Sequence, residues 1–217
     1  MTAILITVTG IVFKQSALRI LPLYISLLVY ILKAQANRYA NLIGGINALF
    51  YTVVYLYLGL YATAGYSALF SFPIQIATFI RWGKNKYGQS TVFRKMNGRE
   101  RLAVSAGFLA AFAGLFAVLK AAGSSHQLLD NLSSLLGMLV SALAMLAYIE
   151  YTWLALPASV MCIALNIATM TTHPEQITYL ISSVYSFLCE MRQFVVVRHL
   201  YTKQHADDTR GGISNSV

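Results

Sequence analysis

Charged residues are scarce in this sequence, and acidic ones are the scarcest. Only 11% of the 217 residues are charged, and just seven are Asp or Glu. A soluble domain has about a quarter of its residues charged. The mean hydropathy of +0.63 and the 58% share of hydrophobic residues instead indicate an integral membrane protein. The length fits one compact transmembrane domain over 1–217, because no long polar segment could form a second.

Groups that carry out chemistry are also missing. No His, Cys, Asp and Glu cluster has the spacing of metal ligands, and there is no Gly-Lys-Ser/Thr phosphate loop. GGIN at 44–47 is too short and wrongly placed for a dinucleotide fingerprint. Cys162 and Cys189 lie inside apolar stretches, where they are expected to be small core residues. We therefore expect a protein that is not an enzyme and holds neither cofactor nor metal.

The net charge of +9 does not indicate a nucleic-acid partner. The basic residues cluster between or after hydrophobic stretches, and no basic and aromatic platform outside the bilayer could hold a strand. The expected partner of this surface is the lipid bilayer. The apolar run 2–13 has no basic region before it and no small-residue cleavage site, so it is not a signal peptide.

Hydropathy predicts seven core spans, since a membrane-crossing helix needs roughly 20 apolar residues. The spans are 16–33, 39–57, 66–82, 102–122, 128–148, 153–171 and 176–197. Residues 83–101 are a basic loop, and the polar tail 199–217 is expected to be disordered. The run 2–13 is too short to cross alone, so it is either a truncated extra span or an interfacial segment.

The basic residues set the orientation. With seven spans, thirteen Lys and Arg fall on one side and three on the other, which makes the first side cytoplasmic. The C-terminus and the loop 83–101 are then cytoplasmic. The thirteen are Lys33, Arg38, Arg81, Lys84, Lys86, Arg94, Lys95, Arg99, Arg101, Arg192, Arg198, Lys203 and Arg210, and the three are Lys14, Arg19 and Lys120.

Two consecutive spans carry polar groups at helical spacing. Asn47 and Tyr51 are four apart in 39–57, and Gln75, Phe79 and Trp82 recur at i, i+4 and i+7 in 66–82. A buried amide in hydrocarbon is costly unless it finds a partner or faces a cavity. These helix faces indicate a water-accessible interior that can bind a ligand. The alternative is that Asn47 and Gln75 only bond neighbouring helices.

The last two spans add further candidates. Trp153 lies at the cytoplasmic end of 153–171, and Asn166 follows on the same helix. Glu190 lies within 176–197, and an intramembrane acid is a functional candidate, although an ion pair with Arg192 or Arg81 remains equally open. Because such acids are so few, facilitated diffusion is the simplest mode of transport.

The span 102–122 differs from its neighbours. Ala103, Gly107, Ala110 and Gly114 give it a small-residue face with almost no polar content, which suits a packing linker. One helix between two groups of three leaves both groups in the same orientation. We therefore expect two parallel three-helix bundles, 16–82 and 128–197, joined by a linker helix.

The order of these motifs resembles the PnuC-type vitamin transporters. KAQANRYANLIGGINALFY at 33–51 looks like the family's Ala-Lys-Gly turn and Gly-x-x-Asn-x-x-x-Tyr helix, and the latter falls on Gly44, Asn47 and Tyr51. GLYA at 59–62, PIQIATFIRWGKN at 73–85 and LDNLSSLLGML at 129–139 are similar to further family segments. Trp153 matches the first Trp of the family's Trp-x-x-Trp-x-x-x-Asn signature, whereas Leu156 and Val160 depart from the rest. Phe79 stands where many members have tryptophan.

The resemblance implies a fold similar to the SWEET sugar transporters and a bacterial inner-membrane location. It also implies uptake of nicotinamide riboside, thiamine, riboflavin or a nucleoside, which a cytoplasmic kinase then traps by phosphorylation. The predicted substrate-binding residues are Asn47, Tyr51, Gln75, Phe79, Trp82, Trp153, Asn166 and Glu190. A non-transporting membrane-complex subunit and a SWEET-like sugar transporter stay open as alternatives, and so does assembly into a homo-oligomer.

Overall fold

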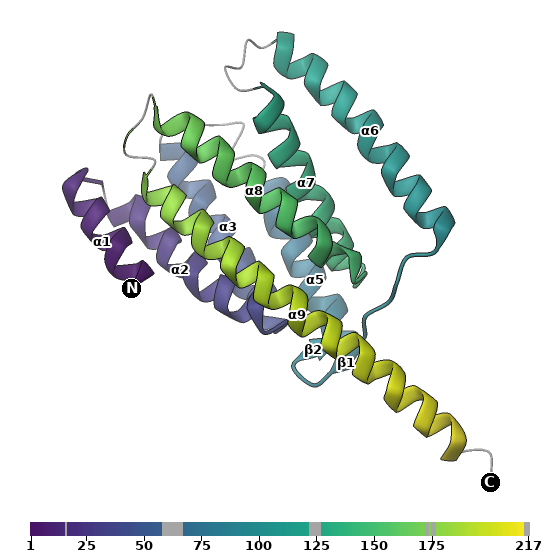
Figure 1. The fold of residues 1–217 in the computed structure, drawn as a ribbon. Coiled ribbons are helices and arrows are strands. Elements are labelled where there is room, and N and C mark those ends of the chain that lie inside the picture. Colours follow the sequence, from purple (N-terminus) through teal and green to yellow (C-terminus); the bar gives the residue numbers. More distant parts are fainter. Residues whose placement is uncertain (16, 58–66, 122–126, 172–173, 175–176, 215–217) are drawn as a thin grey trace.

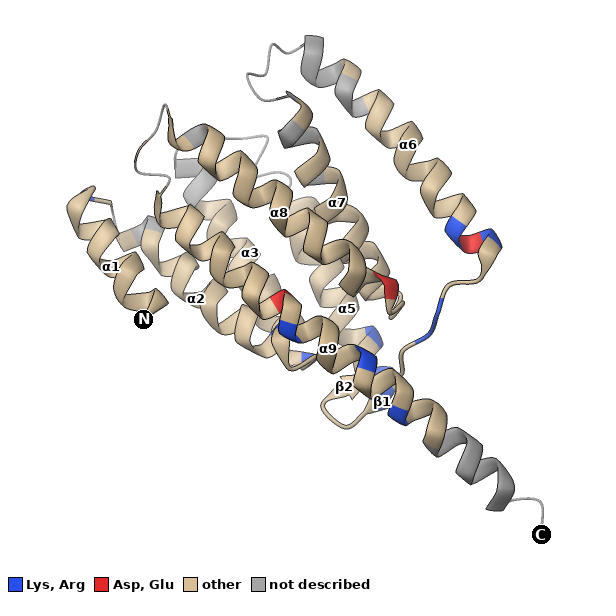
Figure 2. Cartoon of the chain, viewed as in Figure 1, with Lys and Arg blue, Asp and Glu red and all other residues tan. Residues whose placement is uncertain are grey.

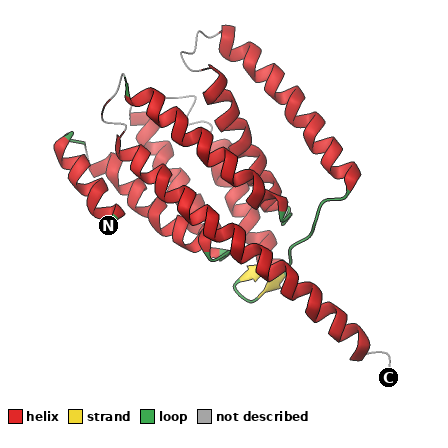
Figure 3. Ribbon diagram, viewed as in Figure 1, coloured by secondary structure: helices red, strands yellow, loops and turns green. Residues whose placement is uncertain are grey.

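The chain is helical almost throughout (Figures 1 and 3). This computed structural model describes residues 1–217 except 16, 58–66, 122–126, 172–173, 175–176 and 215–217. The expected all-helical class is confirmed. The elements are α1 (Thr2–Val12), α2 (Ala17–Ala34), α3 (Tyr39–Tyr57), a π-helical turn η1 (Ser67–Ser71), α5 (Phe72–Lys84), β1 (Lys86–Tyr87), β2 (Ser90–Thr91), α6 (Gly98–Ala121), α7 (Gln127–Met145), α8 (Glu150–Met170) and α9 (Ile177–Ser214).

Six of the described helices form a closed ring. Neighbours in sequence pack together, α2 on α3, α3 on α5, α7 on α8 and α8 on α9. The ring closes where α5 packs on α7 and where α2 packs on α9. Helix α6 lies outside this ring against α7, at the edge of the bundle (Figure 1). The group α2, α3 and α5 therefore meets the group α7, α8 and α9 at two contacts, α5 with α7 and α2 with α9.

Helix α1 packs on the outside of the ring against α2 and α9. The hydroxyls of Thr7 and Tyr24 share a hydrogen bond, and just beyond α1 the Nε2 of Gln15 donates to Thr178 Oγ1 over 3.2 Å. Its 11 residues rise about 16 Å, roughly half the thickness of a hydrocarbon core. The segment 2–13 is thus helical but too short to cross the bilayer by itself.

Two helices of the described part are long and apolar enough to cross a membrane. They are Glu150–Ala168 of α8 and Ile177–Ala206 of α9. Shorter apolar helices run over Thr2–Val12, Ile20–Ala34 and Leu135–Met145. The span 66–82 is divided between η1 and α5, because the chain forms one wide turn before Pro73 enters the first turn of α5. The turn expected at 59–62 and residue 66 lie outside the described residues.

The prediction of a disordered tail is wrong for the described residues 199–214. Helix α9 runs on to Ser214, because part of its extension packs on the bundle. Leu200 and Tyr201 contact a core cluster, and the side chain of Gln204 is buried. The pair Gly211 and Gly212 suggested disorder, yet both lie inside the helix.

The basic loop 83–101 is more ordered than the sequence indicates. β1 and β2 pair as a hairpin, Lys86 with Thr91 and Tyr87 with Ser90, and Gly88 adopts the positive φ of 59° that its turn requires. Residues 92–97, here named the strap, lead from the hairpin to α6. Two helix starts also differ from expectation, since α6 begins at Gly98 and α8 at Glu150. Figure 2 shows Lys and Arg gathered at this end of the bundle.

Candidate functional site

A cavity of about 210 Å³ lies among the helices of the ring. Residues of α2, α3, α5, α7, α8 and α9 all contribute to its wall, so both groups of three helices enclose it. The wall consists of Lys33, Ala36, Asn37, Ala40, Asn41, Ser71, Ile74, Gln75, Thr78, Trp82, Val140, Ser141, Ala144, Tyr151, Ala155, Glu190 and Gln193.

Gln75 is the first of three sequence-predicted residues at this cavity. Its Nε2 donates to Ser71 Oγ over 3.1 Å, one turn earlier in the chain. A Cβ placed on Gly44 would collide with Gln75 Oε1. The glycine therefore lets the amide lie against the backbone of α3, between that helix and the cavity.

Trp82 is the second, and it connects the two groups of helices. The ring is 3% exposed, and its Nε1 donates to the carbonyl oxygen of Ala144 over 2.8 Å. Since Ala144 belongs to α7, this hydrogen bond ties α5 to α7 beside the cavity. The Trp82 ring also packs at a steep angle against the rings of Phe93 and Tyr151.

Glu190 is the third, and it presents a carboxylate held by two serines. The hydroxyls of Ser159 and Ser186 donate to its two oxygens, the second over 3.2 Å. Lys33 lines the same cavity, but no direct ion pair joins it to Glu190 among the residues that the structure describes. The ion pair with Arg192 or Arg81, which the sequence left as an alternative, is likewise not formed in this part of the chain. The wall thus carries an acidic and a basic side chain that do not pair directly.

Eight further polar residues of the wall were not among the predicted binding residues. They are Lys33, Asn37, Asn41, Ser71, Thr78, Ser141, Tyr151 and Gln193. The Nε2 of Gln193 donates to the Tyr151 hydroxyl over 3.1 Å, and both side chains are buried. Asn41 is also buried and lines the same cavity. Gln193 follows the predicted residue Glu190 by three positions on the same helix, so helical spacing could have found it.

Asn47 and Tyr51 lie between α2 and α3 and not in the cavity wall. Asn47 Nδ2 donates to Pro22 O over 3.1 Å and to Ser26 Oγ over 2.9 Å. The Tyr51 hydroxyl is 3.4 Å from the same Ser26 Oγ. These hydrogen bonds hold α3 against α2. The Oδ1 of Asn47 is nevertheless buried without a hydrogen-bond partner among the residues that the structure describes.

The remaining three predicted residues are also away from the cavity wall. Phe79 packs on Tyr39, and the guanidinium of Arg38 lies over both rings. Asn166 Nδ2 donates to Ser183 Oγ over 2.8 Å, which joins α8 to α9. Trp153, with half of its surface exposed, packs edge-on against Phe194 and lies beneath Arg198. The structure therefore brings together Gln75, Trp82 and Glu190 but none of the other five.

The strap packs against Trp82 and Tyr151, the aromatic residues of the cavity wall. Phe93 is 2% exposed, and its ring stacks with Tyr151 and meets Trp82 edge-on. Gln204 of α9 holds this segment at both sides, because Phe93 N–H donates to its Oε1 over 3.0 Å and its Nε2 donates to Thr91 O over 2.9 Å. One buried amide thus fastens hairpin and strap to the extended helix.

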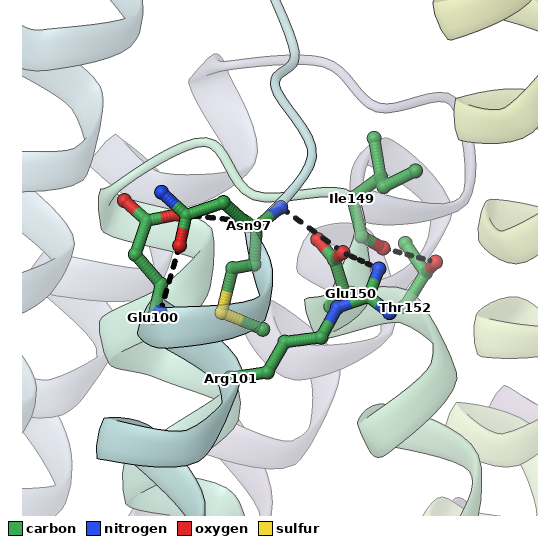
Figure 4. A network of polar contacts seen from close by, with 7 residues as sticks. Asn97, Glu100, Arg101, Ile149, Glu150 and Thr152 are labelled. Atoms are coloured by element: carbon green, nitrogen blue, oxygen red, sulfur yellow. Dashed lines mark hydrogen bonds and ion pairs between the residues drawn. The ribbon is translucent and has the colours of Figure 1, made fainter.

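A polar network fixes the far end of the strap (Figure 4). Asn97 and Glu100 exchange side-chain and backbone hydrogen bonds, which is a capping box at the start of α6. Glu150 Oε1 accepts from Met96 N–H over 3.1 Å and pairs with Arg101 at 3.0 Å. The Tyr148 hydroxyl donates to Glu100, and this bond holds the pKa of that carboxyl below its usual value. The network joins α6 to the turn before α8.

The cavity has the chemistry of a binding site for a small polar molecule with a ring. Amides, a carboxylate and an ammonium group supply hydrogen bonds, and Trp82 and Tyr151 supply aromatic faces. Its volume is below the roughly 300–1,000 Å³ of common ligand pockets, which favours a small ligand.

Comparison with known proteins gives two findings. The sequence profile of a family described as nicotinamide mononucleotide transporter matches residues 16–191. A solved structure described as the crystal structure of the vitamin B3 transporter PnuC is similar, with a TM-score of 0.76 and 18% sequence identity. The similarity covers 94% of this chain and 89% of the other, and it shows that the two share a fold. No curated protein matched the sequence.

Proposed function

Since this chain belongs to the nicotinamide mononucleotide transporter family, we propose that it carries a small vitamin precursor across the bacterial inner membrane. The proposed cargo is nicotinamide riboside or a related compound, such as thiamine, riboflavin or a nucleoside. The similar solved structure is described as a vitamin B3 transporter, which supports the first of these. Transport takes place by facilitated diffusion, and a cytoplasmic kinase traps the product by phosphorylation.

The cavity enclosed by both groups of helices is the observation that carries this proposal. A transporter needs a site between two bodies that can move against each other. The groups α2–α3–α5 and α7–α8–α9 meet at α2 with α9 and at α5 with α7, and the cavity wall takes residues from both. This arrangement supports two three-helix bundles with α6 as the linker.

The wall suggests a role for each polar group. Gln75 and Asn41 bond the polar edge of the ring or the ribose hydroxyls, and Trp82 and Tyr151 stack on its π-face. Glu190 accepts hydrogen bonds from hydroxyls or balances a positive ring. Asn47 lies outside this wall, so its Oδ1 would contact a ligand only in another conformation of the transport cycle. Tyr51, Phe79, Trp153 and Asn166 then act by holding helices or in another conformation of the transport cycle.

The two tryptophans of the chain permit a direct test. In Trp153→Phe protein, fluorescence comes from Trp82 alone, so a ligand that enters the cavity should change it. In Trp82→Phe protein the only remaining indole, Trp153, is outside the wall, and the same ligand should change the signal little. Nicotinamide riboside, thiamine, riboflavin and thymidine would be titrated into both purified variants.

Three outcomes decide the matter. A saturable change confined to the Trp153→Phe variant supports the cavity and names the ligand. A change confined to the Trp82→Phe variant moves the site to Trp153. No change and no retention of any labelled compound by either variant contradicts the proposal and favours a non-transporting subunit.

A further inference from the structure

A second hollow lies on the outer side of the contact between α5 and α7. It is an open groove of about 520 Å³, lined by Ala77, Ile80, Arg81, Lys84, Asn85 and Met145. Residues 77, 80, 81 and 84 follow the i, i+3, i+4 and i+7 spacing of one helix face. Thr78 and Trp82 of the same helix face the central cavity instead. Helix α5 therefore separates two different sites.

The groove combines an apolar floor with two exposed cations. Ala77, Ile80 and Met145 form the floor, and the Ile80 side chain is half exposed. Arg81 and Lys84 stand on the rim one turn apart on α5. Figure 2 shows that Lys and Arg gather at this end of the bundle. Within the described part of the chain, no carboxylate pairs with either of them. Two unpaired cations beside apolar surface attract a molecule with an anionic head and a hydrocarbon body.

We propose that this groove binds an anionic phospholipid of the surrounding leaflet. The phosphate is held by Arg81 and Lys84, with Asn85 as an additional donor, and an acyl chain covers Ile80 and Met145. A free phosphate would use the rim but leave the floor in contact with water or lipid tails, so the lipid satisfies both parts of the groove. Basic groups near a membrane surface each strengthen such binding.

The position of the groove gives the lipid a consequence for transport. It lies over the contact between α5 and α7, where Trp82 Nε1 bonds to Ala144 O next to Met145. A lipid here contacts both groups of helices at one of their two junctions. It therefore favours the conformation in which these helices are in contact. The proposal rests on the membrane location of the family and not on which vitamin is carried.

Binding is measured on purified, delipidated protein by native mass spectrometry with phosphatidylglycerol, with phosphatidylcholine, and with inorganic phosphate as competitor. Arg81→Gln with Lys84→Gln removes both cations, and we expect an affinity for phosphatidylglycerol at least tenfold lower, from about fivefold per charge. Lys95→Gln with Arg99→Gln is the matched control, since it removes the same charge from exposed positions outside the groove. The exchange Arg81→Lys with Lys84→Arg keeps both charges and should bind like the unaltered protein.

Loss of phosphatidylglycerol in the groove variant alone, at an unchanged melting temperature, supports the site. Equal loss in groove and control variants reveals diffuse electrostatic attraction and contradicts it. Equal binding of phosphatidylcholine, or displacement of the lipid by millimolar phosphate, overturns the assignment to an anionic lipid. Because the cargo is not part of this assay, its result stands apart from the transport proposal.

Discussion

At the scale of single residues, the amides of Gln75 and Asn47 differ in what surrounds them. Gln75 faces the cavity, so Gln75→Leu should lower ligand affinity about threefold to tenfold, from roughly 0.5–1.5 kcal/mol for one hydrogen bond, with little change in melting temperature. Asn47→Leu removes two bonds to α2 and should chiefly lower the melting temperature.

Binding and melting temperature would be measured on the same purified variants. A Gln75→Leu protein that binds with unaltered affinity would remove that amide from the site. An additional loss of affinity in Asn47→Leu protein would place its Oδ1 on the ligand, as the sequence predicted.

Gly44 sets the place of the Gln75 side chain and gives a second test at this scale. In Gly44→Ala the new methyl group takes the space of Gln75 Oε1, and a flexible amide can turn away at small energetic cost. We expect affinity to fall severalfold, as in Gln75→Leu, while the helices stay folded. Gly137→Ala is the control, because nothing lies within 4 Å of its added Cβ. Equal affinities in the two alanine variants would show that the position of Gln75 is immaterial.

At the scale of elements, hydropathy predicts the helices but not the ordered conformation of the strap. Predicted spans such as 39–57 agree with the structure because apolar runs of that length must be helical in lipid. The order of strap and tail depends on Gln204 meeting Phe93, which is 111 positions away in the chain. Local sequence carries no sign of such a contact. For the same reason, spacing found Gln75, Trp82 and Glu190 but could not show which faces turn toward a shared cavity.

The bond between Gln204 and the strap can be broken selectively. Gln204→Leu leaves Phe93 N–H and Thr91 O buried without partners, at a cost of about 1–3 kcal/mol each. We expect faster amide hydrogen exchange in 90–97 and in the extension of α9, while α3 and α8 stay protected. Lys203→Gln, one residue away and exposed, is the control and should exchange like the unaltered protein. Unchanged exchange in 90–97 would show that Gln204 does not hold the strap.

At the scale of the whole molecule, the hairpin and the end of α8 are expected on opposite sides of the membrane. The imbalance of thirteen basic residues to three predicts that the hairpin is cytoplasmic. Single cysteines at the exposed positions Gln89 and Thr171, in protein with Cys162→Ala and Cys189→Ala, test this orientation. An impermeant thiol reagent added to intact cells should label position 171 and not 89. Labelling of position 89 from outside would reverse the orientation.

The energy source of transport is the last property of the whole molecule that the cavity predicts. Glu190 is the acid in the described wall, two serine hydroxyls donate to it, and Lys33 stands in the same wall. One acid and one base in the same wall can balance each other's charge, so the cavity needs no coupling ion to be electrically neutral. We therefore expect the cargo to move down its own gradient alone.

Proteoliposomes with equal cargo inside and outside should show no net accumulation when a proton or sodium gradient is imposed, whereas a cargo gradient should drive flux. Liposomes without protein give the background, and Glu190→Gln tests the acid. Accumulation that follows the proton gradient, and that disappears in Glu190→Gln protein, would show coupled transport through this carboxylate. Accumulation unaffected by that substitution would place the coupling at another group, and both results would exclude facilitated diffusion.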